Sequence, residues 1–309
     1  MRNILVGYVR LLVLVGVLLL SAQAMAQGAE QSMRLAGLKV AVWSDPANTN
    51  TKQPVIIFSH GFHGCATQSR FLMEAFARAG YIVFAPNHRD ATCDGGAATL
   101  LSGPVIPFRS PDRWSDTTYR DRDEDIRHLI DAIKHDEQFQ GRVDMSRLGL
   151  CGHSLGGYTV LGLGGAWPSW KLAGVKAVLA LSPYSEPFML HDTIKDLSVP
   201  VMYQGGTWDF EITPFIDKSK GAYDQSPEPK YFVEFDRAGH LAWTNMTTGA
   251  HDEISAYALA FMNHYVRSAH ADPVLTSVLP GVVQLRYASE LGTKKIVNNS
   301  SANRVGAPQ

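Results

Sequence analysis

The chain has 309 residues, of which 45% are hydrophobic and 18% are charged, so it is long and apolar enough to bury a large core. Its formal net charge is −1, from 28 basic and 29 acidic residues, which leaves no excess charge to attract nucleic acid or a membrane surface. The composition excludes a disordered chain and predicts a globular protein that binds no nucleic acid.

The first 26 residues have the three parts of a secretory signal peptide. Arg2 and Arg10 supply positive charge, the apolar run LLVLVGVLLL follows, and the sequence AMA ends at residue 26 as a cleavage site. The apolar run is too short to cross a bilayer comfortably. We therefore expect a secreted or periplasmic protein with no stable membrane anchor after cleavage. An uncleaved anchor is the alternative.

Apolar runs rich in β-forming residues alternate with amphipathic helical patterns along the rest of the chain. The strands are expected at residues 38–44, 54–60, 81–86, 147–152, 175–182, 199–206 and 230–235. The helices are expected at residues 71–79, 118–135 and 254–265, and directly after Ser154. Continuous apolar strands separated by helices predict an α/β fold, with a mostly parallel central sheet flanked by helices on both faces.

The pattern predicts a single catalytic domain, residues 27–270. Within it, residues 87–117 are irregular and rich in Gly, Pro and Asp, which predicts a long loop or a small cap. Residues 271–309 have no clear pattern beyond VLPGVVQLRY, and we expect a C-terminal tail of unknown role.

The stretch GLCGHSLGG, residues 149–157, places Ser154 between glycines at the end of an apolar run. In a G-x-S-x-G turn, small residues two before and two after the serine leave room for a sharp strand-to-helix turn that presents the hydroxyl as a nucleophile. Gly152 and Gly156 occupy those positions. The alternative is an ordinary helix N-cap serine, but the strand before it and the helical pattern after it favour the nucleophile.

A serine nucleophile needs a base and an acid that orients the base, in the chain order Ser, Asp or Glu, His. Asp209 follows the buried strand expected at 199–206 and is the preferred acid. Glu211 and Asp217 are its competitors. His240 follows the next expected strand, in the loop DRAGH, and is the preferred base.

Two backbone N–H groups should stabilise the oxyanion, one of them from the residue after the nucleophile. That residue is Leu155, and we choose Phe62 of FSHGFHG, in the loop after an early strand, as the second donor. His60 and His63 of the same loop are a weak metal signal, because no carboxylate or cysteine cluster accompanies them. We therefore expect no metal and no organic cofactor.

The chain has three cysteines. Cys151 lies within the apolar run before Ser154 and should be a buried thiol. Cys65 and Cys93 each follow an expected strand, and both loops emerge at one edge of the sheet if those strands are parallel neighbours. Disulfides form in exported proteins, so we predict a Cys65–Cys93 bridge, with two free thiols as the alternative.

Aromatic side chains follow several strands whose ends should meet near the serine. We expect Tyr184 and Trp208 to line the substrate pocket, because aromatic rings at strand ends can form an apolar cleft. Simple packing in the core is the alternative for each ring.

The motifs SHGF, GYIVFAPNHRD, RVDMSRLGLCGHSLGG, GGTWD and AGH occur in this order. Over residues 40–266 the chain resembles the α/β-hydrolase superfamily, in the branch of secreted platelet-activating-factor acetylhydrolases, dienelactone-hydrolase-like proteins and bacterial polyesterase, lipase and cutinase enzymes. The resemblance implies the α/β-hydrolase fold, with Ser154 as nucleophile, Asp209 as orienting acid and His240 as base. The serine differs from the usual cysteine of dienelactone hydrolases, and the chain lacks the cysteine pair that secreted polyesterases carry near the C-terminus.

The expected function is a secreted serine hydrolase that cleaves a small-molecule or lipid ester through an acyl-enzyme. One alternative is a cofactor-free haloperoxidase or perhydrolase with the same triad. Another is a binding protein that has the fold without the catalysis. The sequence indicates no oligomeric state.

Overall fold

The computed structural model describes residues 29–45, 51–93, 96–99 and 101–298. The expected signal peptide, residues 1–26, lies outside the described residues. Within the described ranges, no helix is both long enough and apolar enough to cross a membrane.

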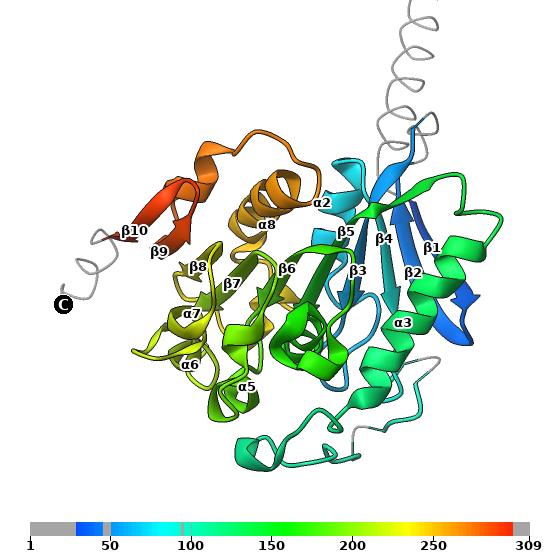
Figure 1. The fold of residues 1–309 in the computed structure, drawn as a ribbon, viewed down its shortest axis with the longest axis horizontal. Helices are drawn as coiled ribbons and strands as arrows, with labels where there is room; N and C mark the ends of the chain where they lie inside the picture. The colour runs from blue at the N-terminus through cyan, green and yellow to red at the C-terminus, as the bar shows by residue number, and fades with distance from the viewer. Residues whose placement is uncertain (1–28, 46–50, 94–95, 100, 299–309) are drawn as a thin grey trace, which may run out of the picture.

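The described residues form a ten-stranded sheet in the order β1-β2-β4-β3-β5-β6-β7-β8-β9-β10 (Figure 1). From β4 to β8 in this order the neighbouring strands are parallel, and the pairings outside them are antiparallel. The sheet is therefore mixed, with a parallel centre and antiparallel edges. The strands are β1 (Ala29–Leu35), β2 (Leu38–Ser44), β3 (Gln53–Ser59), β4 (Ile82–Pro86), β5 (Val143–His153), β6 (Val175–Leu181), β7 (Val201–Gly206), β8 (Lys230–Phe235), β9 (Val282–Ser289) and β10 (Gly292–Val297).

Two apolar clusters lie on opposite faces of this sheet. Successive residues of a strand point to opposite faces, and Ile57 of β3 belongs to one cluster while Ile56 belongs to the other. Every residue of β3 is buried, which is why this strand is a continuous apolar run rather than an alternating one.

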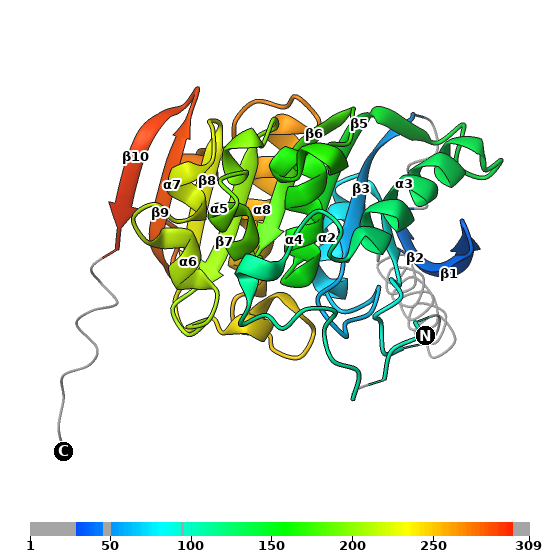
Figure 2. The same ribbon diagram turned by 60° about the horizontal axis from the view of Figure 1, so that its bottom comes forward.

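The helices divide between these two clusters. The large buried apolar residues of α3 and α4 pack in the cluster that contains Ile57, and those of α2 and α8 pack in the cluster that contains Ile56. Figure 2 shows α3, α4 and α5 over the same face of the sheet. The α-helices are α2 (Arg70–Arg78), α3 (Arg120–His135), α4 (Leu155–Leu161), α5 (Glu186–Leu190), α6 (Thr213–Asp217), α7 (Ala222–Gln225) and α8 (His251–Tyr265).

The loop after β3 and the loop after β4 are joined covalently. Cys65 and Cys93 form a disulfide bond with their Cα atoms 6.0 Å apart, so the predicted bridge is confirmed. Strands β3 and β4 are parallel neighbours, and their following loops therefore start at the same edge of the sheet. Cys151 is buried and free, also as expected.

The segment between β4 and α3 is held to the molecule by Trp114. This residue is fully buried, and its ring lies 5.2 Å from the ring of Tyr158 in α4 and 4.7 Å from that of Tyr184. The described residues of the segment between β4 and α3 contain a short 3-10 helix, η1 (Pro111–Arg113), and are otherwise irregular. The packing of Trp114 brings this segment over the end of the sheet that carries Ser154.

The C-terminal segment extends the sheet. Strand β9 pairs with β8 and β10 pairs with β9, both antiparallel, so residues expected only to form a tail of unknown role add a hairpin at one edge. Leu285 of β9 is fully buried and packs in the same cluster as α8. The hairpin therefore covers the edge of β8, which would otherwise expose unpaired backbone groups.

We predict that Leu285→Ala lowers the free energy of unfolding by about 2–5 kcal/mol, because it leaves a cavity in the core. Lys294→Ala, at an exposed position of β10, is the matched control and should change that free energy by no more than about 0.5 kcal/mol. Urea unfolding followed by circular dichroism measures both variants. Equal stability of the two variants would contradict the structural role of the hairpin.

Candidate active site

Ser154 occupies the tight turn between β5 and α4. Its φ of 56° and ψ of −116° lie in a region that residues with a side chain rarely adopt. A Cβ at Gly152 would lie 2.2 Å from the carbonyl oxygen of Gly156, and a Cβ at Gly156 would lie 1.9 Å from that of Ser59. Only glycine fits at these two positions, which is the physical reason for the spacing seen in the sequence.

The structure brings Ser154, His240 and Asp209 together. His240 Nε2 lies 2.9 Å from Ser154 Oγ, and His240 Nδ1 lies 3.1 Å from Asp209 Oδ1. The three residues follow the carboxyl ends of β5, β8 and β7, which are parallel and therefore end at one edge of the sheet. The side chain of Asp209 is buried, so water competes little for its hydrogen bonds.

The competing carboxylates have other surroundings. Asp217 forms an ion pair with Arg286, with 2.8 Å between Oδ1 and Nη1. Glu211 is exposed at the rim of the cavity that contains Ser154. The carboxylate that contacts His240 is that of Asp209.

Ser182 is a member of this site that sequence reasoning missed. Its fully buried hydroxyl donates a hydrogen bond to Asp209 Oδ2 and lies 2.9 Å from His240 Nδ1. Ser182 directly follows β6, the strand between β5 and β7 in the sheet. Its position at the same edge as Ser154 and Asp209 is the sequence signal that could have identified it. Together with Thr213, whose Oγ1 donates to Asp209 Oδ2 over 3.3 Å, it holds the carboxylate in place beside His240.

Two backbone amides, those of Leu155 and Phe62, lie near Ser154. Leu155 is the first residue of α4, where an N–H has no partner within the helix. Phe62 lines the same cavity as Ser154, and a Cβ at neighbouring Gly61 would lie 3.4 Å from Ser154 Cβ. Within the described part of the chain, neither the Phe62 N–H nor the Leu155 N–H makes a hydrogen bond, so both can bind an oxyanion.

A large cavity of about 1070 Å³ opens beside Ser154. Both predicted pocket residues lie on it: Trp208 is 57% exposed, and Tyr184 is buried with its hydroxyl donating to the carbonyl of Phe108. Aromatic rings form the largest group among its lining residues, and a few charged groups also line it. Its aromatic lining consists of Phe62, Phe108, Tyr184, Trp208, Phe210 and Phe215.

A chain of hydrogen bonds through His153 links the loop after β3 to His240. The Gly61 N–H donates to Gln68 Oε1 over 3.1 Å, Gln68 Nε2 lies 3.0 Å from His153 Nδ1, and His153 Nε2 lies 2.8 Å from the carbonyl oxygen of His240. Burial, and the nearby charge of His240, lower the pKa of His153 to about 3. His153 is therefore neutral near pH 7, with Nδ1 free to accept from Gln68 and Nε2–H donating to His240.

A second serine, histidine and aspartate are hydrogen-bonded in the same order as Ser154, His240 and Asp209. His88 Nε2 lies 3.0 Å from Ser59 Oγ, and His88 Nδ1 lies 2.8 Å from Asp125 Oδ2. Ser59 and His88 are fully buried. Burial raises the pKa of Asp125 to about 6, and it lowers the pKa of His88.

His60 and His63 are not part of a cluster of metal ligands within the described residues. His60 is fully buried, with Nδ1 2.7 Å from the carbonyl oxygen of Gly61 and Nε2 accepting from the N–H of His88. No group of three or more His, Cys, Asp or Glu side chains within the described ranges is arranged to hold a metal ion.

Comparison with known proteins identifies the family. The PET hydrolase-like family matches residues 115–272, just over half of the chain. The chain belongs to this family. Residues 20–100 also match the family of platelet-activating factor acetylhydrolase, isoform II, and the branch of the α/β-hydrolase superfamily inferred from the motifs is thereby confirmed.

Curated relatives of this PET hydrolase-like protein include cutinases. It is 28% identical over 225 residues to Cutinase est2 of Thermobifida alba, which covers 72% of this chain and 62% of the relative. It is 26% identical over 147 residues to the platelet-activating factor acetylhydrolase of Cavia porcellus, covering 39% of this chain and 34% of that protein. The matched segment thus spans less than two thirds of the length of either relative.

We predict that His153 makes the stability of the protein depend on pH. In the unfolded chain this histidine takes up a proton as the pH falls through about 6.5, whereas in the folded protein it does so only near pH 3. The unfolded state therefore binds more protons between these values, and the free energy of unfolding falls by up to about 1.4 kcal/mol per pH unit as the pH is lowered.

His153→Asn removes this titration, so the stability of the wild type relative to the variant should fall from pH 7 to pH 4. Urea unfolding at each pH measures the difference. The control is His135→Asn, at an exposed position in the last turn of α3, and it should leave the pH dependence of the wild type unchanged. Parallel stability curves for wild type and His153→Asn would show that His153 is not held neutral.

Proposed function

We propose that this protein is a serine hydrolase that cleaves carboxylic esters through an acyl-enzyme. The observation that carries the proposal is the unbroken series of hydrogen bonds from Ser154 Oγ through His240 to Asp209, beside a large open cavity. Two free backbone amides near the nucleophile add to it. The curated relatives named as cutinases and as a platelet-activating factor acetylhydrolase support an ester as the substrate.

In the proposed reaction, Ser154 Oγ attacks the ester carbonyl while His240 Nε2 takes its proton. Asp209 accepts from His240 Nδ1 and stabilises the imidazolium that forms. The N–H groups of Phe62 and Leu155 bind the oxyanion of the tetrahedral intermediate. His240 then protonates the leaving alkoxide, and a water molecule repeats the sequence on the acyl-enzyme to release the acid.

The proposed substrate has an apolar or aromatic part next to the ester bond. The wide cavity with aromatic walls supports this choice, because flat or flexible apolar groups can pack against exposed rings such as Trp208 and Phe210. A small-molecule ester and a lipid ester both meet this description. No metal or organic cofactor takes part in the proposed steps.

The proposed location is outside the cytoplasm. The N-terminal pattern of charge, apolar run and cleavage site supports export. The Cys65–Cys93 bridge also supports it, since structural disulfides persist in oxidising compartments.

Ser154→Ala should lower the rate of p-nitrophenyl acetate hydrolysis by at least about 10⁴-fold, because the variant has no nucleophile. The wild type should react covalently with a fluorophosphonate at Ser154, and the variant should not. An unchanged melting temperature serves as the control for folding. Turnover by the folded variant at the wild-type rate would refute the proposed nucleophile, and a wild type that neither turns over esters nor reacts would refute catalysis.

Ser182→Ala should lower kcat about 10- to 100-fold with little change in KM, because a hydrogen bond between a neutral and a charged group contributes about 1.5–3 kcal/mol. Steady-state kinetics with p-nitrophenyl acetate measures this effect. The matched control is Ser185→Ala: Ser185 is also buried, and its hydroxyl makes no hydrogen bond within the described part of the chain. If both variants keep the wild-type kcat, the hydroxyl of Ser182 does not support the orientation of Asp209 and His240.

A further inference from the structure

A buried arginine lies beneath the loop after β3. The side chain of Arg122, near the start of α3, is fully buried. Its Nε and Nη2 donate to the two carboxylate oxygens of Asp90 over 3.0 and 2.7 Å. Burial by itself raises the pKa of Asp90, but the charge and hydrogen bonds of Arg122 outweigh it and hold that pKa below its ordinary value. The pair is thus an ionised fork that fixes the guanidinium plane.

The other donors of Arg122 all reach the residues just before Phe62. Nη1 donates to the carbonyl of His60 over 2.7 Å and to Ser59 Oγ over 3.2 Å. Nη2 donates to the carbonyl of Gly61 over 3.3 Å. The guanidinium therefore donates its remaining N–H groups to three consecutive residues, Ser59, His60 and Gly61.

The direction of the Gly61 carbonyl decides the direction of the next amide. The Gly61–Phe62 peptide bond is trans, so the carbonyl of Gly61 and the N–H of Phe62 point in opposite directions from one rigid plane. Besides Arg122, the Gly61 carbonyl accepts from His60 Nδ1 over 2.7 Å and from the Gly64 N–H over 3.0 Å. Because these donors hold the Gly61 carbonyl on the side of Arg122, the Phe62 N–H points away from Arg122, and Phe62 lines the cavity that contains Ser154.

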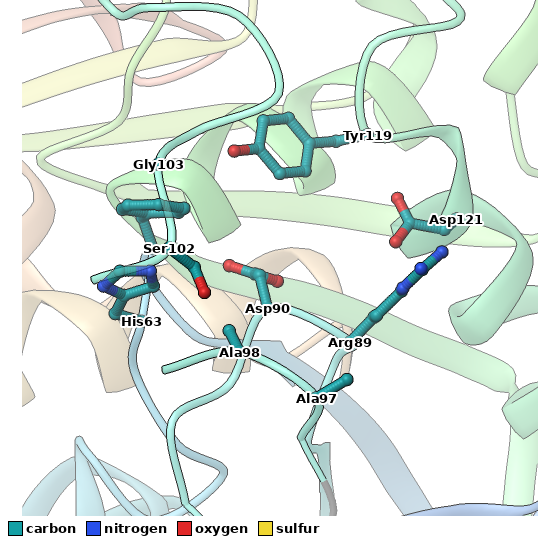
Figure 3. A pocket seen from close by; sticks show the side chains of 10 residues that line it. His63, Arg89, Asp90, Ala97, Ala98, Ser102, Gly103, Tyr119 and Asp121 are labelled. Atoms are coloured by element: carbon teal, nitrogen blue, oxygen red, sulfur yellow. The ribbon is translucent and has the colours of Figure 1, made fainter. Parts of the chain in front are cut away.

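Asp90, which binds Arg122, lines a separate and smaller cavity of about 230 Å³. Figure 3 shows Asp90 between His63 and Arg89, with Tyr119 and Asp121 also on the wall. Phe62 and its neighbour His63 form part of the wall of this small cavity, and Phe62 also lines the aromatic one. Neither Arg122 nor Asp90 lines the cavity of Ser154, so neither can touch a substrate bound there.

We propose that Arg122, fixed by Asp90, is a positioning residue that orients the Gly61–Phe62 peptide plane so that the Phe62 N–H can bind the oxyanion. This inference rests on the proposed ester hydrolysis through Ser154. Arg122 acts only through the backbone, and it matters most when negative charge develops on the carbonyl oxygen. Its loss should therefore affect the transition state more than the bound substrate.

The test replaces Arg122 with Lys, which keeps the charge but cannot make the forked contact with Asp90 and the loop carbonyls together. We expect kcat for p-nitrophenyl acetate to fall up to about 10²-fold, the effect of losing one oxyanion donor, with KM changed less than about twofold. Inhibition by an alkyl trifluoromethyl ketone, which adds to the serine and forms an oxyanion, should weaken by the same factor as kcat.

Arg127→Lys is the matched control. Arg127 lies on the same helix and pairs with Asp123 over 2.7 Å, but it makes no contact with the loop after β3 in the described structure. This variant should keep the wild-type kcat and inhibition constant. If Arg122→Lys does not fold, Asp90→Asn carries the test, with the same joint loss of kcat and inhibitor binding expected.

The outcomes separate this inference from the proposed function. If the wild type hydrolyses the ester through Ser154 but the folded Arg122→Lys keeps its kcat, the positioning role is overturned and the proposed function stands. A loss of kcat with unchanged inhibition by the ketone would also overturn it, because the oxyanion contact would then be intact. A wild type without Ser154-dependent hydrolysis would overturn both.

Discussion

The turn at Ser154 is the constraint on which the site depends. A serine in this backbone conformation costs on the order of 1–3 kcal/mol, which the surrounding packing must offset. The absence of side chains at Gly152 and Gly156 lets β5, α4 and the loop after β3 approach within contact distance. Leu155 has an unpaired N–H because it is the first residue of α4, and the close approach sets the loop of Phe62 against the nucleophile. The strained backbone of Ser154 is thus a consequence of packing β5, α4 and the loop after β3 closely around the nucleophile.

Much of the site could be predicted because short motifs and strand order act together. The glycines around Ser154 are close in sequence and identify the turn directly. Asp209 and His240 are distant, but each follows a strand, and the carboxyl ends of parallel strands meet at one edge of the sheet. The same reasoning, applied to β3 and β4, predicted the disulfide that the structure contains.

Other parts of the structure carry no local signal. Ser182 is a single serine after a strand, and only its contacts with Asp209 and His240 distinguish it from an ordinary loop residue. Arg122 lies within the charged run RDRDED, which resembles a solvated helix face, yet its side chain is buried. Strand β9 contains Gln284 and Arg286, whose polar groups are paired with acidic residues of α6 and α7. Its apolar pattern is therefore interrupted, and the sequence alone does not predict it as part of the sheet.

The hydrogen-bonded series of Ser59, His88 and Asp125 has a consequence for identifying active sites from the geometry of their side chains. Its hydrogen-bond distances are those expected of a nucleophile, a base and an orienting acid, so a template built from interatomic distances alone would match this molecule at two places. No reactant can reach Ser59, because its side chain is sealed inside the protein, whereas Ser154 opens onto a cavity. Accessibility to solvent, more than the arrangement of three side chains, is what distinguishes a reactive constellation from a structural one.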